Sequence, residues 1–220
     1  MTYTGDVRVG GPSDTREIDG LVVTKMAVGP MDNNAYLLRC ASTGQGLLID
    51  AANEPDRLIE MIASVPVGTI VTSHRHADHW QALWEVQQHT GAEVVAHPAD
   101  ADELPVTVTR RVGHGEVLRF GDAEVSVIHL RGHTPGSIAI CYDASGRMAG
   151  EPHVFTGDSL FPGGVGKTVT PETFTSLLND VTERLFDPLP DATWVYPGHG
   201  RDTTLGAERP HLGEWRDRGW

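Results

Sequence analysis

The chain of 220 residues contains little cysteine, little basic charge and no long hydrophobic run. Cys40 and Cys141 are its only cysteines, too few for a disulfide framework, and we interpret both as buried free thiols in strands. No apolar stretch approaches the roughly 18–20 residues needed to cross a bilayer. The first residues also lack the basic and apolar regions of a secretory signal. We therefore expect a cytoplasmic protein that does not bind a membrane.

Basic residues are outnumbered, with 17 Lys and Arg against 30 Asp and Glu and a formal net charge of -13. This field repels a phosphate backbone unless a basic patch is segregated, and the sequence contains no Lys/Arg run. We therefore exclude a nucleic-acid partner and expect a small-molecule substrate. The composition predicts no oligomeric state.

The hydrophobic content of 39% in 220 residues is enough for a sizeable core. We predict one domain over 1–220, with residues 1–20 forming a loosely ordered N-terminal segment. No low-complexity linker divides the chain.

Short β-rich runs, broken by Gly, Pro and Asn, alternate with fewer helical patterns along the chain. The predicted strands cover 21–28, 34–42, 44–52 and 68–74 in the first half, then 116–121, 123–132, 137–143, 153–160 and 193–200. Helical spacing is found over 54–65, 78–91 and 171–186, with a short helix near the C terminus. We expect Trp84 on the second helix to pack in the core. Two similar halves of this kind predict an α/β layered sandwich.

The segment TSHRHADHW, residues 72–80, places four potential metal ligands within six positions. If the preceding strand continues extended, His74 and His76 point to the same side. Asp78 and His79 then lie in the first turn of the next helix. Imidazole nitrogens and a carboxylate are suitable ligands for Zn²⁺, and crowding them together without a cation would be costly. The spacing therefore predicts a metal site.

Three other strand-like runs end in a potential ligand flanked by glycine: His133 after Gly132, Asp158 after Gly157, and His199 between two glycines. Glycine permits the tight turns and close backbone approach that loops around an ion require. We therefore expect these three loops to converge on the first motif.

The motifs HRHADH (74–79), GHTPGS (132–137), FTGDSLFPGGVGK (155–167) and PGHGRDTTLGAE (197–208) carry a resemblance that covers nearly the whole chain from residue 21. The sequence resembles the metallo-β-lactamase-fold hydrolases, and within them the glyoxalase II-like branch. The resemblance implies an αβ/βα four-layer sandwich holding two divalent metal ions. It implies a first metal bound by His74, His76 and His133, and a second bound by Asp78, His79 and His199. It implies that Asp158 bridges both, where dizinc β-lactamases have a cysteine, which argues against a native lactamase role.

Two adjacent divalent ions can lower the pKa of a shared water toward ~7 and polarise a carbonyl group. A thiolate leaves without much help from an acid, since the pKa of a free thiol is roughly 8.5. We therefore predict thioester hydrolysis by a metal-bridging hydroxide, with Asp158 and Asp78 as catalytic residues and Asp78 orienting the hydroxide. Zn²⁺ is the expected metal, with Fe and Mn as alternatives because such ligand sets accept each of them.

Other activities remain open at this stage. A persulfide dioxygenase would hold one iron through His74, His76, His133 and Asp158, and other relatives of the fold would cleave lactones or phosphodiesters. The resemblance also implies that Lys167 contacts the anionic end of a glutathione carrier. Val169 stands where an aromatic residue usually follows, and few residues remain after His199. An anion-binding Lys167 and a solvated loop charge therefore both stay open.

Overall fold

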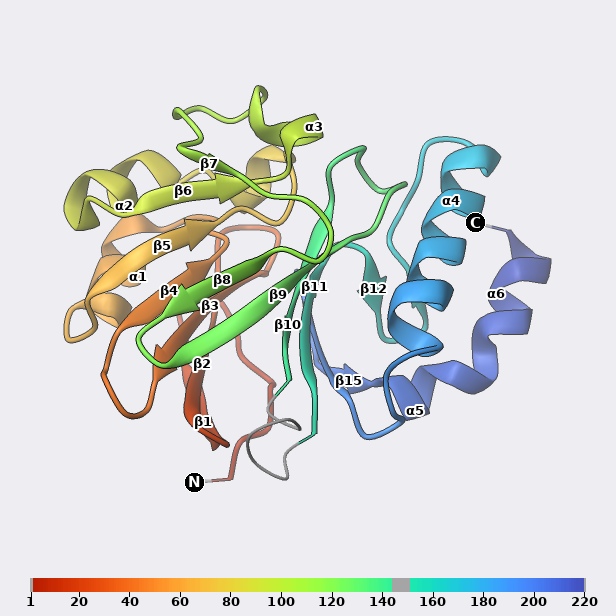
Figure 1. Cartoon of the computed structure of the whole chain (residues 1–220), viewed down its shortest axis with the longest axis horizontal. Coiled ribbons are helices and arrows are strands. Elements are labelled where there is room, and N and C mark those ends of the chain that lie inside the picture. Colours follow the sequence, from red (N-terminus) through yellow and green to blue (C-terminus); the bar gives the residue numbers. More distant parts are fainter. Residues whose placement is uncertain (1, 144–150, 220) are drawn as a thin grey trace.

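The computed structural model describes residues 2–143 and 151–219, which form two sheets between outer layers of helices (Figure 1). The seven-stranded sheet contains, in spatial order, β1 (Asp14–Ile18), β2 (Leu21–Val28), β3 (Asn33–Cys40), β4 (Gly46–Ile49), β5 (Val67–Val71), β6 (Glu93–Ala96) and β7 (Arg110–Arg111). Neighbouring strands pair antiparallel from β1 to β4 and parallel from β4 to β7.

The six-stranded sheet contains, in spatial order, β15 (Thr203–Thr204), β14 (Trp194–Pro197), β11 (His153–Gly157), β10 (Ile138–Tyr142), β9 (Ala123–His129) and β8 (Val117–Phe120). A separate two-stranded hairpin joins β12 (Leu160–Phe161) to β13 (Gly164–Val165). The helices are α1 (Pro55–Ile62), α2 (Leu83–Thr90), α3 (Pro98–Ala101), α4 (Pro171–Val181), α5 (Leu205–Glu208) and α6 (Leu212–Arg218).

Alternating side chains of the central strands build three apolar cores. On β3, Tyr36 and Leu38 lie in the core between the sheets, whereas Leu37 packs toward α1 and α2. On β10, Ile140 faces the same central core and Cys141 faces α4 and α6. Because both faces of these strands are covered, their sequences are almost continuously apolar. The result is the predicted αβ/βα four-layer sandwich, in which Cys40 and Cys141 are buried and free.

The predicted helix over 78–91 was wrong in its first part. Residues Ala77–His79 form a single 3-10 turn, and α2 begins only at Leu83. The backbone N–H groups of Gln81 and Ala82 donate to carbonyls of the β4–α1 loop, so they cannot continue a helix from residue 78. Trp84, on α2, is 56% exposed rather than packed in the core.

The N-terminal segment also differs from the loose segment that we expected over 1–20. Residues Asp14–Ile18 form the edge strand β1, which makes five residue pairs with β2. Nearer the N terminus, the Tyr3 hydroxyl donates to Asp202, 2.7 Å away.

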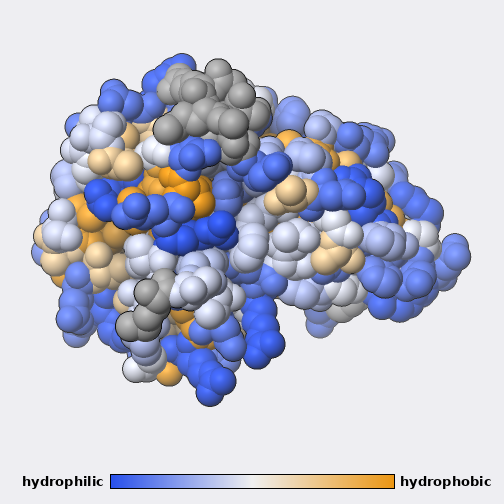
Figure 2. Space-filling model, turned by 90° about the horizontal axis from the view of Figure 1, so that it is seen from below, coloured by the Kyte–Doolittle hydropathy of each residue, from blue (hydrophilic) through white to orange (hydrophobic). Residues whose placement is uncertain are grey.

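The molecular surface is largely polar on the side where the N terminus and α5 lie in Figure 1. Figure 2 shows this face with mainly hydrophilic residues and a few smaller hydrophobic areas among them. Within residues 2–143 and 151–219, every helix is too short or too polar to cross a membrane.

Candidate metal centre

All seven predicted ligands lie just beyond the carboxyl ends of strands. His74 and His76 follow β5, and Asp78 and His79 lie on the adjoining 3-10 turn. The other three, His133, Asp158 and His199, follow β9, β11 and β14, respectively. Strand β5 ends at Val71, so the extended continuation predicted through His76 does not form. The two imidazoles are brought together by the loop instead.

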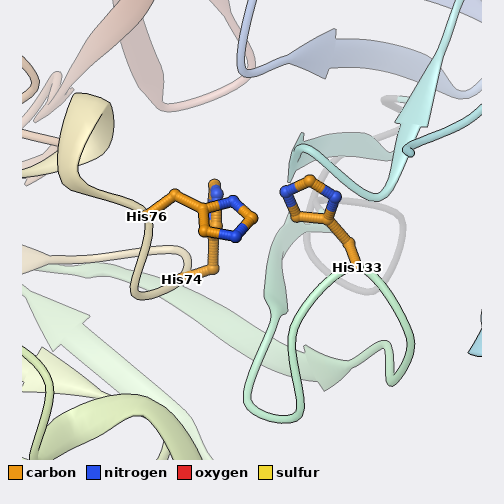
Figure 3. A group of neighbouring side chains, drawn as sticks. All are labelled: His74, His76 and His133. Atoms are coloured by element: carbon orange, nitrogen blue, oxygen red, sulfur yellow. The ribbon is translucent and has the colours of Figure 1, made fainter. Parts of the chain in front are cut away.

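A first group consists of His74, His76 and His133. One ring nitrogen of each lies within 4.8 Å of the corresponding atoms of the other two. Figure 3 shows the rings of His74 and His76 extending from one loop toward His133 on another. The His133 ring centroid lies 4.8 Å from that of His74 and 4.6 Å from that of His76. Two loops that are distant in sequence therefore form one nitrogen-rich cluster.

A second group consists of Asp78, His79 and His199. His199 Nε2 lies 3.3 Å from Asp78 Oδ2, and His79 Nε2 lies 3.5 Å from the same oxygen. The two imidazole nitrogens are 3.2 Å apart. This cluster offers two nitrogens and one carboxylate oxygen.

Asp158 lies between the two groups. Its Oδ1 is 3.3 Å from His79 Nε2, and its Oδ2 is 3.4 Å from His199 Nε2 and 3.6 Å from His133 Nε2. One carboxylate therefore faces ligands of both groups, as the bridging position predicted for Asp158 requires.

The inward-facing atoms fit a cation. Among the described residues, His74 Nε2, His133 Nε2 and Asp158 Oδ1 are buried and have no hydrogen-bond partner. Leaving such atoms unpaired in a buried site is costly, and this cost is removed when they coordinate a metal. Five imidazoles and two carboxylates together form a donor set suited to a borderline divalent ion.

The outward-facing ring nitrogens have partners that orient the rings. His79 Nδ1 lies 2.8 Å from Asp50 Oδ2, and His74 Nδ1 lies 3.0 Å from Ser73 Oγ. His133 Nδ1 donates to the Lys167 carbonyl at 2.7 Å, and His199 Nδ1 donates to the Met31 carbonyl at 2.8 Å. Partners of this kind fix the tautomer and direct each Nε2 toward the metal.

The sequence did not predict the roles of three residues that contact the ligands or their loops. Asp50 was interpreted as part of a strand, although it accepts hydrogen bonds from both the backbone N–H and the hydroxyl of Ser73. Asn33 donates to Asp78 Oδ2 at 2.8 Å. Lys167 acts through its carbonyl, while its side chain is exposed. Only the loop position of Lys167 was visible as a local signal, because the predicted strand 44–52 placed Asp50 within a strand, whereas β4 ends at Ile49.

The centre favours ionised carboxylates. The pKa of Asp78 is lowered chiefly by its hydrogen bond to His199. Burial would raise the pKa of Asp158, but contacts with His199 and His79 outweigh it and lower that pKa. Burial opposes protonation of His79, yet the nearby Asp50 and Asp158 carboxylates raise its pKa to about 10. The carboxylates that favour a proton on the His79 ring would likewise favour a metal cation in place of that proton.

Gly198 permits the close approach of these groups. A Cβ atom at this position would lie 2.2 Å from Asp158 Oδ1 and 2.7 Å from His79 Cε1. Any side chain here would therefore displace a ligand.

A cavity of about 320 Å³ opens beside the centre. His133, Asp158, Phe161 and Lys167 line it together with the glycine-rich hairpin between β12 and β13. A larger cavity of about 480 Å³ lies at the opposite ends of β4 and β5, around Val65 and Arg119, and contains none of the seven predicted ligands. The smaller cavity is lined by two of the predicted ligands and the larger one by none, so the smaller cavity is the candidate substrate site.

Comparison with known proteins agrees with this geometry. Residues 28–199 match the family model of the metallo-beta-lactamase superfamily. The chain belongs to this superfamily. Its metal-dependent hydrolases bind divalent ions, and the four-layer fold and His/Asp clusters described above agree with membership.

Individual members of the superfamily are similar along most of their length. Hydroxyacylglutathione hydrolase GloC of Haemophilus influenzae is 31% identical over 185 residues, which cover 74% of this chain and 83% of the relative. The crystal structure of ETHE1 from Myxococcus xanthus has a TM-score of 0.75 and 28% identity, covering 89% of this chain and 84% of that one. TTHA1623, solved in a di-iron-bound form, has a TM-score of 0.67 and 32% identity, covering 84% and 96%.

Proposed function

We propose that this protein hydrolyses thioesters or closely related small acyl compounds with the help of two divalent metal ions. The observation that carries the proposal is the convergence of six other predicted ligands around Asp158, with buried nitrogens and an oxygen left unpaired toward the centre. The negative charge of the whole chain agrees with a small-molecule substrate rather than a nucleic acid.

One ion would be held by His74, His76 and His133, and the other by Asp78, His79 and His199, with Asp158 between them. When bound, such ions supply a bridging hydroxide at neutral pH and polarise the substrate carbonyl. We expect Zn²⁺, with iron and manganese as alternatives that the same ligands accept. The di-iron form of TTHA1623 supports keeping iron among the candidates.

The two carboxylates would have separate tasks. Asp78 is held by Asn33 Nδ2 at 2.8 Å and faces His199, so its carboxylate would lie where it can accept a hydrogen bond from the attacking water. Asp158 keeps the two ligand groups at a fixed separation because its oxygens face both of them. Both tasks require an ionised carboxylate, in agreement with the lowered pKa values of Asp78 and Asp158.

The cavity supports an acyl-thiol substrate. Asp158, already assigned to the metals, is the only carboxylic acid among its described lining residues. A thiolate needs no acid to leave, since its conjugate thiol has a pKa of roughly 8.5, whereas an alkoxide does. The exposed Lys167 at the rim would bind an anionic group of the thiol carrier. The similarity to a hydroxyacylglutathione hydrolase supports this substrate class.

The test combines elemental analysis with turnover of a substrate panel by the purified full chain. We expect about two metal ions per chain and hydrolysis of S-acyl thiols in preference to lactones and phosphodiesters. Asp158→Ala should lose metal and activity together. A single iron with oxygen consumption on persulfides would replace the proposal with a dioxygenase. A metal-loaded sample that cleaves only lactones or phosphodiesters would overturn the thioester assignment.

A further inference from the structure

Asp100 is a buried carboxylate that belongs to neither ligand group. It lies on the short helix α3, and only 1% of its surface is exposed. Its hydrogen-bond partners come from two different loops, and each of these loops carries ligands of the first group.

One oxygen of Asp100 joins the two loops directly. Asp100 Oδ2 accepts from the backbone N–H of Arg75 at 3.1 Å, and Arg75 stands between His74 and His76. The same Oδ2 accepts from the hydroxyl of Thr134, the residue that follows His133. A single atom therefore connects the neighbours of all three ligands in the first group.

The second oxygen strengthens the link to the loop 132–137. Asp100 Oδ1 accepts from the Gly136 N–H at 2.9 Å. A Cβ atom on Gly136 would lie 2.6 Å from the Asp100 carboxyl carbon, so this approach depends on glycine. The Ser137 hydroxyl lies 2.7 Å from Thr134 Oγ1, which orients the Thr134 hydroxyl toward Asp100.

The structure assigns Asp100 the role of a positioning residue that sets the separation of the His74–His76 loop and the His133 loop, and thereby the affinity of the first metal position. This inference rests on the proposed two-metal function. Metal–nitrogen bonds of about 2.0–2.1 Å tolerate little displacement, so a small change between the loops disfavours three-ligand binding.

The effect should be specific to the first position. In the second group, Asp78 and His79 adjoin the loop of His74 and His76, but they have their own partners in Asn33 and Asp50. His199 lies in the loop after β14, and the Asp100 contacts described above do not include that loop. A general loss of stability would instead weaken both positions.

Helix α3 has other contacts that should keep it in place when Asp100 is changed. The ring of His97, which precedes α3, stacks on His129 with centroids 3.8 Å apart. His129 Nε2 in turn donates to the Pro135 carbonyl at 2.8 Å.

The experiment is a Co²⁺ titration of the metal-free full chain against a competing chelator, in which the visible spectrum resolves the two binding steps. His133→Ala and His199→Ala identify which step belongs to which position. The test variants are Asp100→Asn and Thr134→Val, with Thr134→Ser as the conservative rescue. Asp102→Asn is the matched control, because Asp102 ends the same helix but is exposed and pairs with Arg111.

We expect Asp100→Asn and Thr134→Val to weaken the His133-dependent step by about 10- to 100-fold and the other step by less than about threefold. Thr134→Ser and Asp102→Asn should bind as the wild type does. Equal weakening of both steps, or no change in either, overturns the positioning role. If Asp100→Asn does not fold, Thr134→Val and Thr134→Ser still decide the question. A wild type that binds no Co²⁺ would instead overturn the metal centre itself.

Discussion

Asp50 and His79 form a buried pair, with 2.8 Å between Asp50 Oδ2 and His79 Nδ1. Their side chains are 2% and 0% exposed, respectively. The carboxylate also accepts from the backbone N–H of Ser73 at 2.7 Å, so it ties the start of the first motif to its end. A ring that donates through Nδ1 presents Nε2 to the metal, and Asp50 therefore orients a ligand that it reaches across 29 residues.

Replacing Asp50 with Asn should weaken metal binding by about 10- to 100-fold at the position that uses His79. An amide has one acceptor oxygen, so its Nδ2 would face either the Ser73 N–H or the pair of donors Ser73 Oγ and His79 Nδ1. The measurement is the same Co²⁺ titration. Asp56→Asn, on the exposed side of α1, removes the same charge and serves as the control. Unchanged binding by Asp50→Asn would show that the pair does not orient the ring.

Gly198→Ala should reduce metal content and turnover, because its methyl group would meet Asp158 Oδ1 and His79 Cε1. Gly200→Ala is the matched control. At Gly200 a Cβ atom would meet nothing within 4 Å, but φ is +68°, so this variant should lose about 1 kcal/mol of stability and keep its metal. Elemental analysis and urea unfolding of both variants separate the two effects. Full metal content in Gly198→Ala would contradict the contact argument.

Lys25 and Asp202 form a second buried pair, with 2.6 Å between Nζ and Oδ1 and side chains that are 0% and 2% exposed. Lys25 also donates to the carbonyl of Gly200, next to His199. Lys25→Met should reduce the free energy of unfolding by about 3–5 kcal/mol, because the carboxylate is left buried without its cation. The double variant with Asp202→Asn should recover part of this loss.

Urea unfolding measures both Lys25 variants, and Arg111→Met is their control. The Arg111–Asp102 pair is exposed, so its loss should change stability little. If Lys25→Met were as stable as the wild type, the buried pair would contribute nothing to the fold.

His153 should make the fold acid-sensitive. Burial lowers the pKa of this ring to about 4, and its Nδ1 lies 3.0 Å from the Tyr196 hydroxyl. The unfolded chain binds a proton near pH 6.5, whereas the folded chain does not until about pH 4. The stability contribution is therefore intact above pH 6.5 and is lost as the pH falls from 6.5 toward 4. Between pH 7 and pH 5 it amounts to about 2 kcal/mol.

The measurement is urea unfolding of EDTA-treated protein at pH 7 and pH 5. His153→Asn retains an acceptor for Tyr196 but does not titrate, so its stability should fall less than that of the wild type over this interval. His89→Asn changes an exposed ring and should retain the wild-type pH dependence. Equal pH dependence in His153→Asn and the wild type would refute the assignment.

Local patterns were sufficient to predict much of this protein. Short, almost continuously apolar runs bounded by turn residues identified strands such as β2 and β10, because both faces of these strands are covered. The close spacing from His74 to His79, and glycines beside His133, Asp158 and His199, identified the candidate ligands from residue type alone. These signals lie within short segments, so they can be recognised without knowledge of contacts between distant segments.

Other features depended on contacts between distant segments. Helix α2 begins at Leu83 because carbonyls of the β4–α1 loop take the N–H groups of the preceding residues. Lysine is usually found at the surface, yet Lys25 is buried because it pairs with Asp202, which lies 177 residues away in the sequence. Asp50 and Asp100 likewise acquire their roles from partners 23 to 36 residues away. The type of a polar residue within an apolar run does not indicate which distant residue it contacts in the folded protein. Only folding brings the opposite charge or donor within hydrogen-bonding distance, so residue types can be read from the chain while their partners require the assembled fold.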